Sequence, residues 1–226
     1  MKIDALGDSA LIINLADEIS DSTRLLARVL SAAETIEVAK LPSVVDVTSS
    51  YESVAVFFDL IYVEPDIVDK IRALIAPAGV RVSGKKQRVE IPVCYDEEFA
   101  LDLDRVANHT SLTPDAIIAL HSSAEYTVAC IGFMPGFPFL SGLPQQLRVP
   151  RLESPRTKVP AGSVAIANVQ AGVYPLESPG GWNVLGRTPL RLFRVNESPP
   201  TLLRPGDFVQ FRRITRDQFE GGERRR

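Results

Sequence analysis

The second half of the chain contains short apolar stretches that decide its fold, among them TVACIGF at 127–133, SVAIANV at 163–169 and FVQFRR at 208–213. Each is rich in β-branched or aromatic residues, as strands are, and glycine and proline recur between the stretches. GVYPL at 172–176 and LRLFRV at 190–195 continue the pattern. Many short strands separated by dense turns predict a closed or partly closed β-barrel.

Upstream of this region, residues 1–84 alternate between strand-like apolar runs and segments whose apolar residues recur at helical spacing. In the first helical segment Leu26 and Val29 share one face, and Pro65 opens the second. The predicted strands are 10–15, 44–48, 54–58 and 80–82, and the predicted helices are 19–38 and the segment between Pro65 and Pro77. This β-α-β-β-α-β order is that of a ferredoxin-like unit.

A polar, flexible stretch at 83–86 (SGKK) predicts a domain boundary between the two patterns. After it we expect a strand at 88–95 and a helical insertion, in which Thr113 caps a helix that has Pro114 at its first position. The predicted fold class is therefore α+β. Its predicted parts are a ferredoxin-like domain at 1–84, a β-barrel domain at 85–215 and a polar tail at 216–226.

Composition and motifs exclude several classes of function. The 25 basic and 28 acidic residues leave a net charge of −3, so we expect no general attraction to nucleic acid or to anionic membranes. No apolar run reaches membrane-spanning length and the N-terminus lacks a signal core, which predicts a cytoplasmic protein. Two histidines and two scattered cysteines lack zinc-ligand spacing, so we expect no metal. Without a P-loop or a dinucleotide fingerprint, the chain itself should bind neither ATP nor another cofactor.

The stretch from 132 to 187 has the composition of a binding site. GFMPGFPFL at 132–140 holds three aromatic residues among prolines and glycines that forbid a regular helix or a central strand. These rings must pack against another part of the barrel, line a pocket or face a partner. SPGGWN at 178–183 adds a turn beside the chain's single tryptophan, and backbone amides in such a turn can form an anion-binding nest.

Cations on short proline-containing loops lie in the same stretch, at Arg151, Arg156, Lys158 and Arg187. Together they suit a carboxylate or phosphate held by charge-assisted hydrogen bonds. The alternative is that these loops only turn the corners of a barrel and leave the cations in solvent. His121, at the end of a predicted helix, has an ordinary pKa suited to a general acid or base, or it interacts with the helix dipole.

Two strings, GFMPGFPFLSGLP at 132–144 and SPRTKVPAGSVAIANVQAGVYPLESPGGWNVLGRTPLRLF at 154–193, resemble one family. It contains the B-type subunit of bacterial 5-oxoprolinase, the sporulation-kinase inhibitor proteins and the subunit 1 region of allophanate hydrolase and urea carboxylase-type enzymes. The resemblance implies a ferredoxin-like domain followed by a cyclophilin-like β-barrel. The strings depart from the family's pattern at Met134 and Phe139, where leucine and tyrosine are expected.

The resemblance further implies a member of an ATP-dependent 5-oxoprolinase complex that cleaves 5-oxoproline to glutamate, a member that is inactive alone. One implied partner is a C-type barrel protein, which would share the site as in the carboxyltransferase region of urea amidolyase. The other is an A-type lactam-utilisation protein that uses ATP. The kinase-inhibitor members imply a second hypothesis, a regulatory protein that binds and inhibits a sensor histidine kinase. Prolyl isomerisation is suggested by the barrel type alone, and a fold does not carry a function.

A set of pocket residues also follows from the resemblance. Arg156, Lys158 and Arg187 would bind an anion, and His121 would transfer a proton. The predicted catalytic residues are His121, Arg156 and Lys158, and the predicted substrate-binding residues are Pro135, Gly136, Gln170, Tyr174, Ser178, Gly180, Gly181, Trp182 and Arg187.

Overall fold

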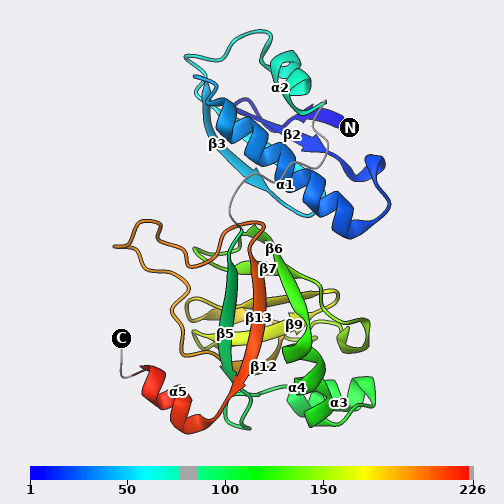
Figure 1. Cartoon of the computed structure of the whole chain (residues 1–226), viewed down its shortest axis with the longest axis vertical. Coiled ribbons are helices and arrows are strands. Elements are labelled where there is room, and N and C mark those ends of the chain that lie inside the picture. The colour runs from blue at the N-terminus through cyan, green and yellow to red at the C-terminus, as the bar shows by residue number, and fades with distance from the viewer. Residues whose placement is uncertain (77–85, 224–226) are drawn as a thin grey trace. The chain divides into compact units, whose positions relative to one another are not determined.

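A computed structural model describes residues 1–76 and 86–223 of the chain (Figure 1). The chain divides into two compact units, Met1–Lys85 and Lys86–Arg226, and each has its own hydrophobic cluster. The predicted boundary at 83–86 lies mostly outside the described residues. No helix in the described part of the chain is long and apolar enough to cross a membrane.

The N-terminal unit is an antiparallel sheet accompanied by two helices. Its elements are β1 (Lys2–Ala5), β2 (Ala10–Asn14), the 3-10 helix η1 (Ala16–Glu18), α1 (Ser22–Ala39), β3 (Val44–Ser49), β4 (Ser53–Phe58) and α2 (Ile67–Ile75). The strands follow the order β1-β2-β4-β3, and α1 lies across one face of the sheet (Figure 1). Asp21 caps α1 by accepting a 2.7 Å hydrogen bond from the Arg24 backbone, and Lys40 ends it in the left-handed conformation.

The strand β1 departs from the predicted β-α-β-β-α-β order. Its sequence, KIDA, has no run of β-branched residues, and it is a strand because its backbone pairs with β2, where Ile3 stands opposite Ile13. The described order is therefore β-β-α-β-β-α. The predicted strand at 80–82 lies outside the described residues. The other three predicted strands and both predicted helices are confirmed, with ends shifted by a few residues.

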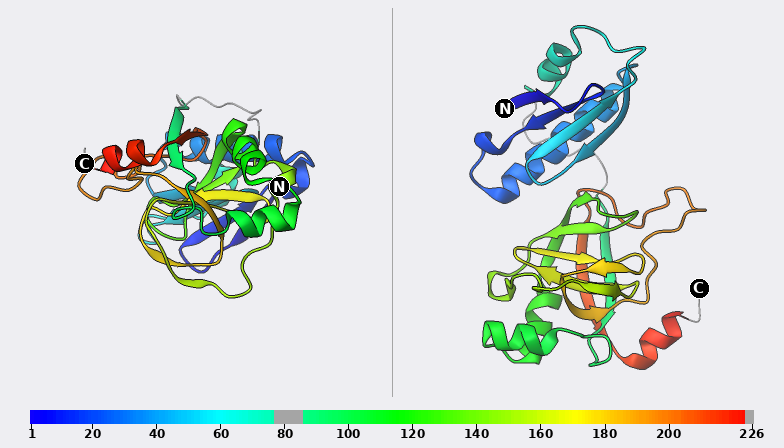
Figure 2. Two further views of the ribbon diagram at one scale, coloured as in Figure 1. Left: turned by 90° about the horizontal axis from the view of Figure 1, so that it is seen from below. Right: turned by 180° about the vertical axis from the view of Figure 1, so that it is seen from behind.

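The second unit contains a closed barrel of seven strands, which confirms the predicted barrel. Its elements are β5 (Arg88–Cys94), α3 (Leu103–Thr110), α4 (Pro114–Ser123), β6 (Glu125–Ile131), β7 (Pro138–Ser141), the 3-10 helix η2 (Gln145–Leu147), β8 (Arg156–Val159), β9 (Ser163–Ala167), β10 (Gln170–Val173), β11 (Ser178–Gly180), β12 (Asn183–Arg187), β13 (Phe208–Ile214) and α5 (Arg216–Glu223). The barrel order is β10-β7-β6-β13-β5-β12-β9, and β5 pairs with β13 in parallel. The helices α3 and α4 lie beside each other at one end of the barrel (Figures 1 and 2).

Strand β9 is buried on both of its faces. Val164 and Ile166 belong to the cluster inside the barrel, whereas Ala165 and Ala167 belong to a second cluster together with Val159 of β8. The strand β8 pairs with β11 in a separate two-stranded sheet. Because successive strand residues point to opposite faces, this second cluster lies on the outside of the barrel wall.

Helix α5 occupies most of the predicted polar tail at 216–226. Its Phe219 is 2% exposed and packs against Ile214, and the rings of Phe219 and Phe99 lie 4.5 Å apart. Burial of one aromatic side chain is enough to dock this short helix. A single phenylalanine among polar residues produces no periodic pattern, so the sequence does not predict the helix. Residues 224–226 lie outside the described residues.

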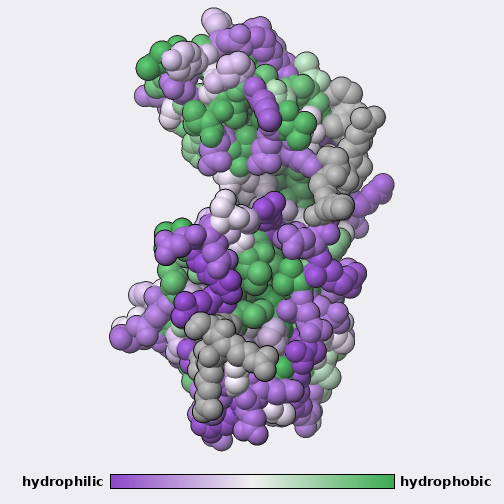
Figure 3. All heavy atoms as spheres, turned by 60° about the vertical axis from the view of Figure 1, so that its left-hand side comes forward, coloured by the Kyte–Doolittle hydropathy of each residue, from purple (hydrophilic) through white to green (hydrophobic). Residues whose placement is uncertain are grey.

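The surface of the barrel unit has apolar areas between hydrophilic ones. On the face drawn in Figure 3, apolar residues (green) gather in an area bordered by hydrophilic residues (purple). Large apolar side chains that stay exposed in this unit include Phe133, Leu176 and Val195. Contiguous exposed apolar surface is typical of binding regions, so the cavities beside such residues are the candidate sites.

Candidate functional site

Five aromatic residues form a connected group on the outer face of the barrel. Phe137 is at its centre, with its ring centroid 5.2 Å from that of Tyr174 and 5.6 Å from that of Trp182, both in edge-to-face arrangements. The group borders a cavity of about 230 Å³, which we call the aromatic cavity. Its lining residues are Phe133, Phe137, Phe139, Arg151, Pro155, Tyr174, Pro179, Gly180, Gly181 and Trp182.

The hairpin between β6 and β7 supplies three of these rings. In its turn Gly132 N donates to Phe137 O over 3.1 Å, and two residues have positive φ, Phe133 at 66° and Gly136 at 79°. A bulky residue in the left-handed region costs on the order of 1–3 kcal/mol. Phe133 is 66% exposed, and its packing consists of edge-to-face ring contacts with Phe137 and Tyr174. The exposed ring lines the aromatic cavity.

Two glycines let aromatic rings lie directly against the backbone. A Cβ on Gly180 would stand 2.4 Å from the Tyr174 hydroxyl oxygen, and a Cβ on Gly172 would stand 2.8 Å from Cζ of Phe137. Glycine in a loop can also let a ligand approach the backbone closely. In the structure the rings of Tyr174 and Phe137 lie against these glycines, and both rings line the cavity.

The hydroxyl of Tyr174 stays protonated at neutral pH. Burial raises the pKa of Tyr174, and a backbone hydrogen bond from Trp182 and the charges of Arg151 and Arg156 offset part of that rise. A protonated phenol donates or accepts hydrogen bonds but is not a base. Tyr174 therefore adds polarity to the site without adding a proton acceptor.

Arg151 is the cation of the aromatic cavity. Its guanidinium carbon lies 5.9 Å from the centroid of the Trp182 ring, and its side chain is exposed to solvent. The backbone beside it is fixed, because Leu152 N donates to Gly181 O over 2.8 Å. In the described part of the chain no carboxylate pairs with Arg151. Its fork of donors is thus available to a ligand anion.

Arg156 and Lys158, predicted as catalytic, are both engaged in ion pairs. The two terminal nitrogens of Arg156 donate to the Asp102 carboxylate over 2.9 and 2.7 Å. Asp102 is 4% exposed and also accepts a 2.7 Å hydrogen bond from the Val184 backbone. Lys158 lies 3.1 Å from Glu177 at the surface. Arg156 therefore ties β8 to the segment before α3, and neither cation lines the aromatic cavity.

His121, the predicted proton-transfer residue, is completely buried inside the barrel unit. Its Nδ1 lies 2.8 Å from the Tyr95 hydroxyl oxygen and its ring stacks on Phe211 at 4.4 Å. Burial lowers the pKa of His121 to about 3, so the ring is neutral near pH 7. His121 is therefore shielded from solvent and does not line the aromatic cavity, and its buried Nε2 has no hydrogen-bond partner among the described residues.

The predicted substrate-binding residues divide between several places. Tyr174, Gly180, Gly181 and Trp182 line the aromatic cavity. Arg187 lines a different cleft at the end of β12. The predicted residues that line neither space are Pro135, Gly136, Gln170 and Ser178.

Several lining residues are absent from the predicted set, namely Phe133, Phe137, Phe139 and Arg151. The signal for them is nevertheless in the sequence, because the 132–140 rings cannot all pack against their own strand neighbours and Arg151 follows a proline. In the described residues no group of three or more histidine, cysteine, aspartate or glutamate side chains could hold a metal ion.

Comparison with known proteins gives concordant matches over most of the chain. The family model described as carboxyltransferase domain, subdomain C and D, matches residues 1–203. The B-type subunit of 5-oxoprolinase from Bacillus subtilis (strain 168) is 40% identical over 96% of this chain and 95% of its own length. The B-type subunit of 5-oxoprolinase from Haemophilus influenzae is 44% identical over 74% of this chain and 78% of its own length.

A solved structure has the same fold. The crystal structure of TTHA0988 has a TM-score of 0.79 to this chain, at 35% sequence identity over 91% of this chain. This chain spans 40% of the length of that protein.

Proposed function

The chain belongs to the family of carboxyltransferase domains, subdomains C and D, and from that premise we propose that it is the B-type subunit of an ATP-dependent 5-oxoprolinase. The complex would cleave the cyclic amide 5-oxoproline to glutamate. Its other members would be a C-type barrel protein and an A-type lactam-utilisation protein, and the latter would use ATP. Two curated relatives named as B-type subunits of 5-oxoprolinase, with 40% and 44% identity, support this assignment.

The observation that carries the proposal is Arg151, which pairs with no carboxylate among the described residues and lies beside Trp182 at a mostly apolar cavity. 5-Oxoproline is a five-membered lactam with one carboxylate. Its ring faces suit packing against Trp182 and Phe139, and its carboxylate suits the guanidinium fork of Arg151. The cavity volume of about 230 Å³ lies below the range of about 300–1,000 Å³ that is typical for drug-sized ligands. A small metabolite fits this size better than a nucleotide.

The lining also indicates how much of the chemistry this chain performs. Its ionisable side chains are Arg151 and Tyr174, and the pKa of Tyr174 is raised. Neither is a general base near pH 7, and neither is a nucleophile suited to amide cleavage. We therefore assign substrate binding and orientation to this chain, and activation and hydrolysis of the amide to groups from its partners.

Reconstitution tests the proposal. The chain would be co-expressed with the C-type and A-type proteins, and glutamate release from 5-oxoproline would be measured with and without ATP. We expect release only from the complete complex with ATP, and none from this chain alone. 2-Pyrrolidinone, the same lactam without the carboxylate, is the matched control; its cleavage would release 4-aminobutyrate, which is assayed separately and should not form. Glutamate release by the isolated chain, or none from an assembled complex, would contradict the proposal.

A further inference from the structure

We propose that the barrel unit has a second ligand site, a cleft of about 470 Å³ at the end of β12 that binds an organic anion through Arg187 and Arg191. This inference is independent of the proposed function. The cleft shares no lining residue with the aromatic cavity, although Tyr174 lines one and its neighbour Pro175 lines the other. We call it the arginine cleft.

The charge of the arginine cleft favours an anion. Arg187 and Arg191 line it, and among the described residues no aspartate or glutamate does. In the described part of the chain neither arginine forms an ion pair. The nearby Glu177 is 3.1 Å from Lys158 and so is paired elsewhere. Two arginines without carboxylate partners on one cleft suit a carboxylate or a phosphate, because each guanidinium offers a planar fork of donors.

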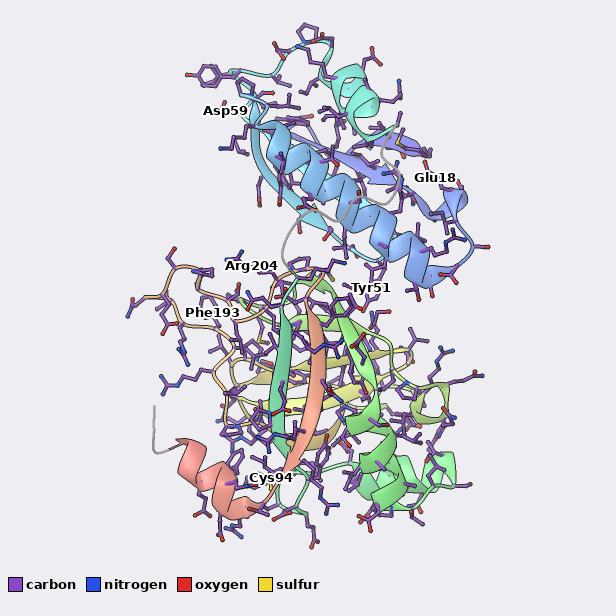
Figure 4. All side chains as sticks on the ribbon, in the orientation of Figure 1. Glu18, Tyr51, Asp59, Cys94, Phe193 and Arg204 are labelled. Carbon is purple, nitrogen blue, oxygen red and sulfur yellow. The ribbon has the colours of Figure 1, made fainter. Side chains whose placement is uncertain are left out.

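The walls of the arginine cleft favour a ligand that also has an apolar part. Leu176, Leu190 and Phe193 line it, and Leu176 is 43% exposed. Phe193, labelled in Figure 4, lies on the segment between β12 and β13. A free inorganic anion would leave these side chains in water. An anion attached to a ring or an alkyl chain would cover them and gain the free energy of apolar burial.

Arg187 is held in place before any ligand arrives. Its Nε donates to Ala161 O over 2.8 Å, and its guanidinium lies over the ring of Phe219 at 5.7 Å. Gly162 has a φ of 83°, and a Cβ there would stand 2.4 Å from Thr188 O, so only glycine allows this turn to meet the end of β12. Helix α5 and the 161–162 turn thus position one of the two cations, which reduces the conformational entropy lost on binding.

Calorimetric titration of the full chain with phenyl phosphate tests the arginine cleft. We expect wild-type protein to bind phenyl phosphate at least about tenfold more tightly than inorganic phosphate, which lacks the apolar part, and to show no binding of phenol, which lacks the charge. Arg191→Gln should weaken phenyl phosphate binding about tenfold, the loss of one charged hydrogen-bonding partner. Arg191 is exposed, so this change should leave the fold intact.

Two matched variants decide where the ligand sits. Arg194→Gln removes a nearby surface cation that is paired with Glu197 at 2.9 Å, and it should bind phenyl phosphate as the wild type does. Arg151→Gln alters the aromatic cavity, whose cation and rings could also take phenyl phosphate, and the binding that Arg191→Gln weakens should persist in this variant. The proposal fails if wild-type protein does not bind phenyl phosphate, if Arg191→Gln binds it equally well, or if Arg151→Gln is the variant that loses it.

Discussion

At the scale of single residues, cations with similar sequence surroundings differ in what their charge meets. Arg156 is bound to Asp102 and Lys158 to Glu177, whereas in the described structure Arg151 meets no carboxylate. The decisive carboxylate of Asp102 is 54 residues away from Arg156 in the sequence. No local pattern therefore separates an available cation from a structural one.

Arg151→Gln tests the proposed binding role of this cation. In a reconstituted complex we expect KM for 5-oxoproline to rise about tenfold or more, because the charged partner of the carboxylate is lost, with a smaller change in kcat. Steady-state glutamate release measures both constants. Arg148→Gln, a change at an exposed arginine outside the aromatic cavity, is the control and should leave KM unchanged. An unchanged KM in Arg151→Gln would show that the carboxylate of 5-oxoproline does not bind Arg151.

Arg156→Ala should destabilise the barrel unit, because it leaves the buried Asp102 carboxylate without its partner. Removal of one member of a buried pair costs about 3–5 kcal/mol, and since Arg156 is itself 30% exposed we expect the lower end of that range. Urea unfolding followed by fluorescence of Trp182, the chain's single tryptophan, measures the loss. Lys158→Ala, at the surface, should change stability by less than about 0.5 kcal/mol. Equal stability of the two variants would show that Arg156 is not structural.

His121 makes stability depend on pH in a defined window. Its pKa is about 3 when folded and near the ordinary value of about 6.5 when unfolded. Above pH 6.5 the His121 ring is neutral in both the folded and the unfolded state. As pH falls from 6.5 toward 3, only the unfolded state binds the proton, so the free energy of unfolding falls. The slope of this loss approaches about 1.4 kcal/mol per pH unit. His121→Gln should show a correspondingly shallower loss in urea unfolding across this window, and an unchanged slope would contradict the neutral, buried state.

At the scale of elements, the site depends on a small sheet packed on a larger one. The outer cluster contains Ala165 and Ala167 of β9. Two elements pack on it, the ribbon formed by β8 and β11 and the hairpin formed by β6 and β7. The alanines are small enough to let these elements approach the barrel wall, and the aromatic rings fill the space that remains. The aromatic cavity is therefore a product of how the elements pack.

Gly180→Ala tests this packing. Its Cβ would stand 2.4 Å from the Tyr174 hydroxyl oxygen, so the Tyr174 ring and β11 must move apart. Overpacking of this kind costs about 1–3 kcal/mol. We expect a shifted Trp182 emission and a lower urea midpoint. Gly221→Ala in α5 is the matched control, because nothing lies within 4 Å of its added Cβ; it should leave the Trp182 emission unchanged and should not lower the urea midpoint. The same result from both variants would mean that Tyr174 is not confined by β11.

At the scale of the whole molecule, each of the two units has its own large hydrophobic cluster. A unit that has its own core can fold by itself. We predict that residues 86–226 expressed alone unfold cooperatively, with the urea midpoint that Trp182 reports in the full chain. Residues 1–85 expressed alone are the complement, and their unfolding would be followed by circular dichroism. Failure of residues 86–226 to unfold cooperatively would show that the barrel unit needs the N-terminal unit.

Local chemistry in the sequence determined most of the secondary structure. The cap at Thr113 with Pro114 starts α4, and the apolar runs at 44–48 and 54–58 are strands, because caps and short-range periodicity act between near neighbours. The resemblance carried by 132–144 and 154–193 also located the region of the aromatic cavity. These features depend on residues near one another in the sequence, so they can be predicted without knowing distant contacts.

Tertiary structure alone decided which cations and histidines are buried or paired and which line a cavity. His121 is sealed inside the barrel by Tyr95 and Phe211, and Arg156 is held by Asp102, while Arg151 is left to face the aromatic cavity. The burial of a side chain, the charges beside it and the cavity it lines all depend on contacts between segments far apart in the chain. A cation or a histidine has the same side chain in every case, and only those long-range contacts set its pKa, its partner and its access to a ligand.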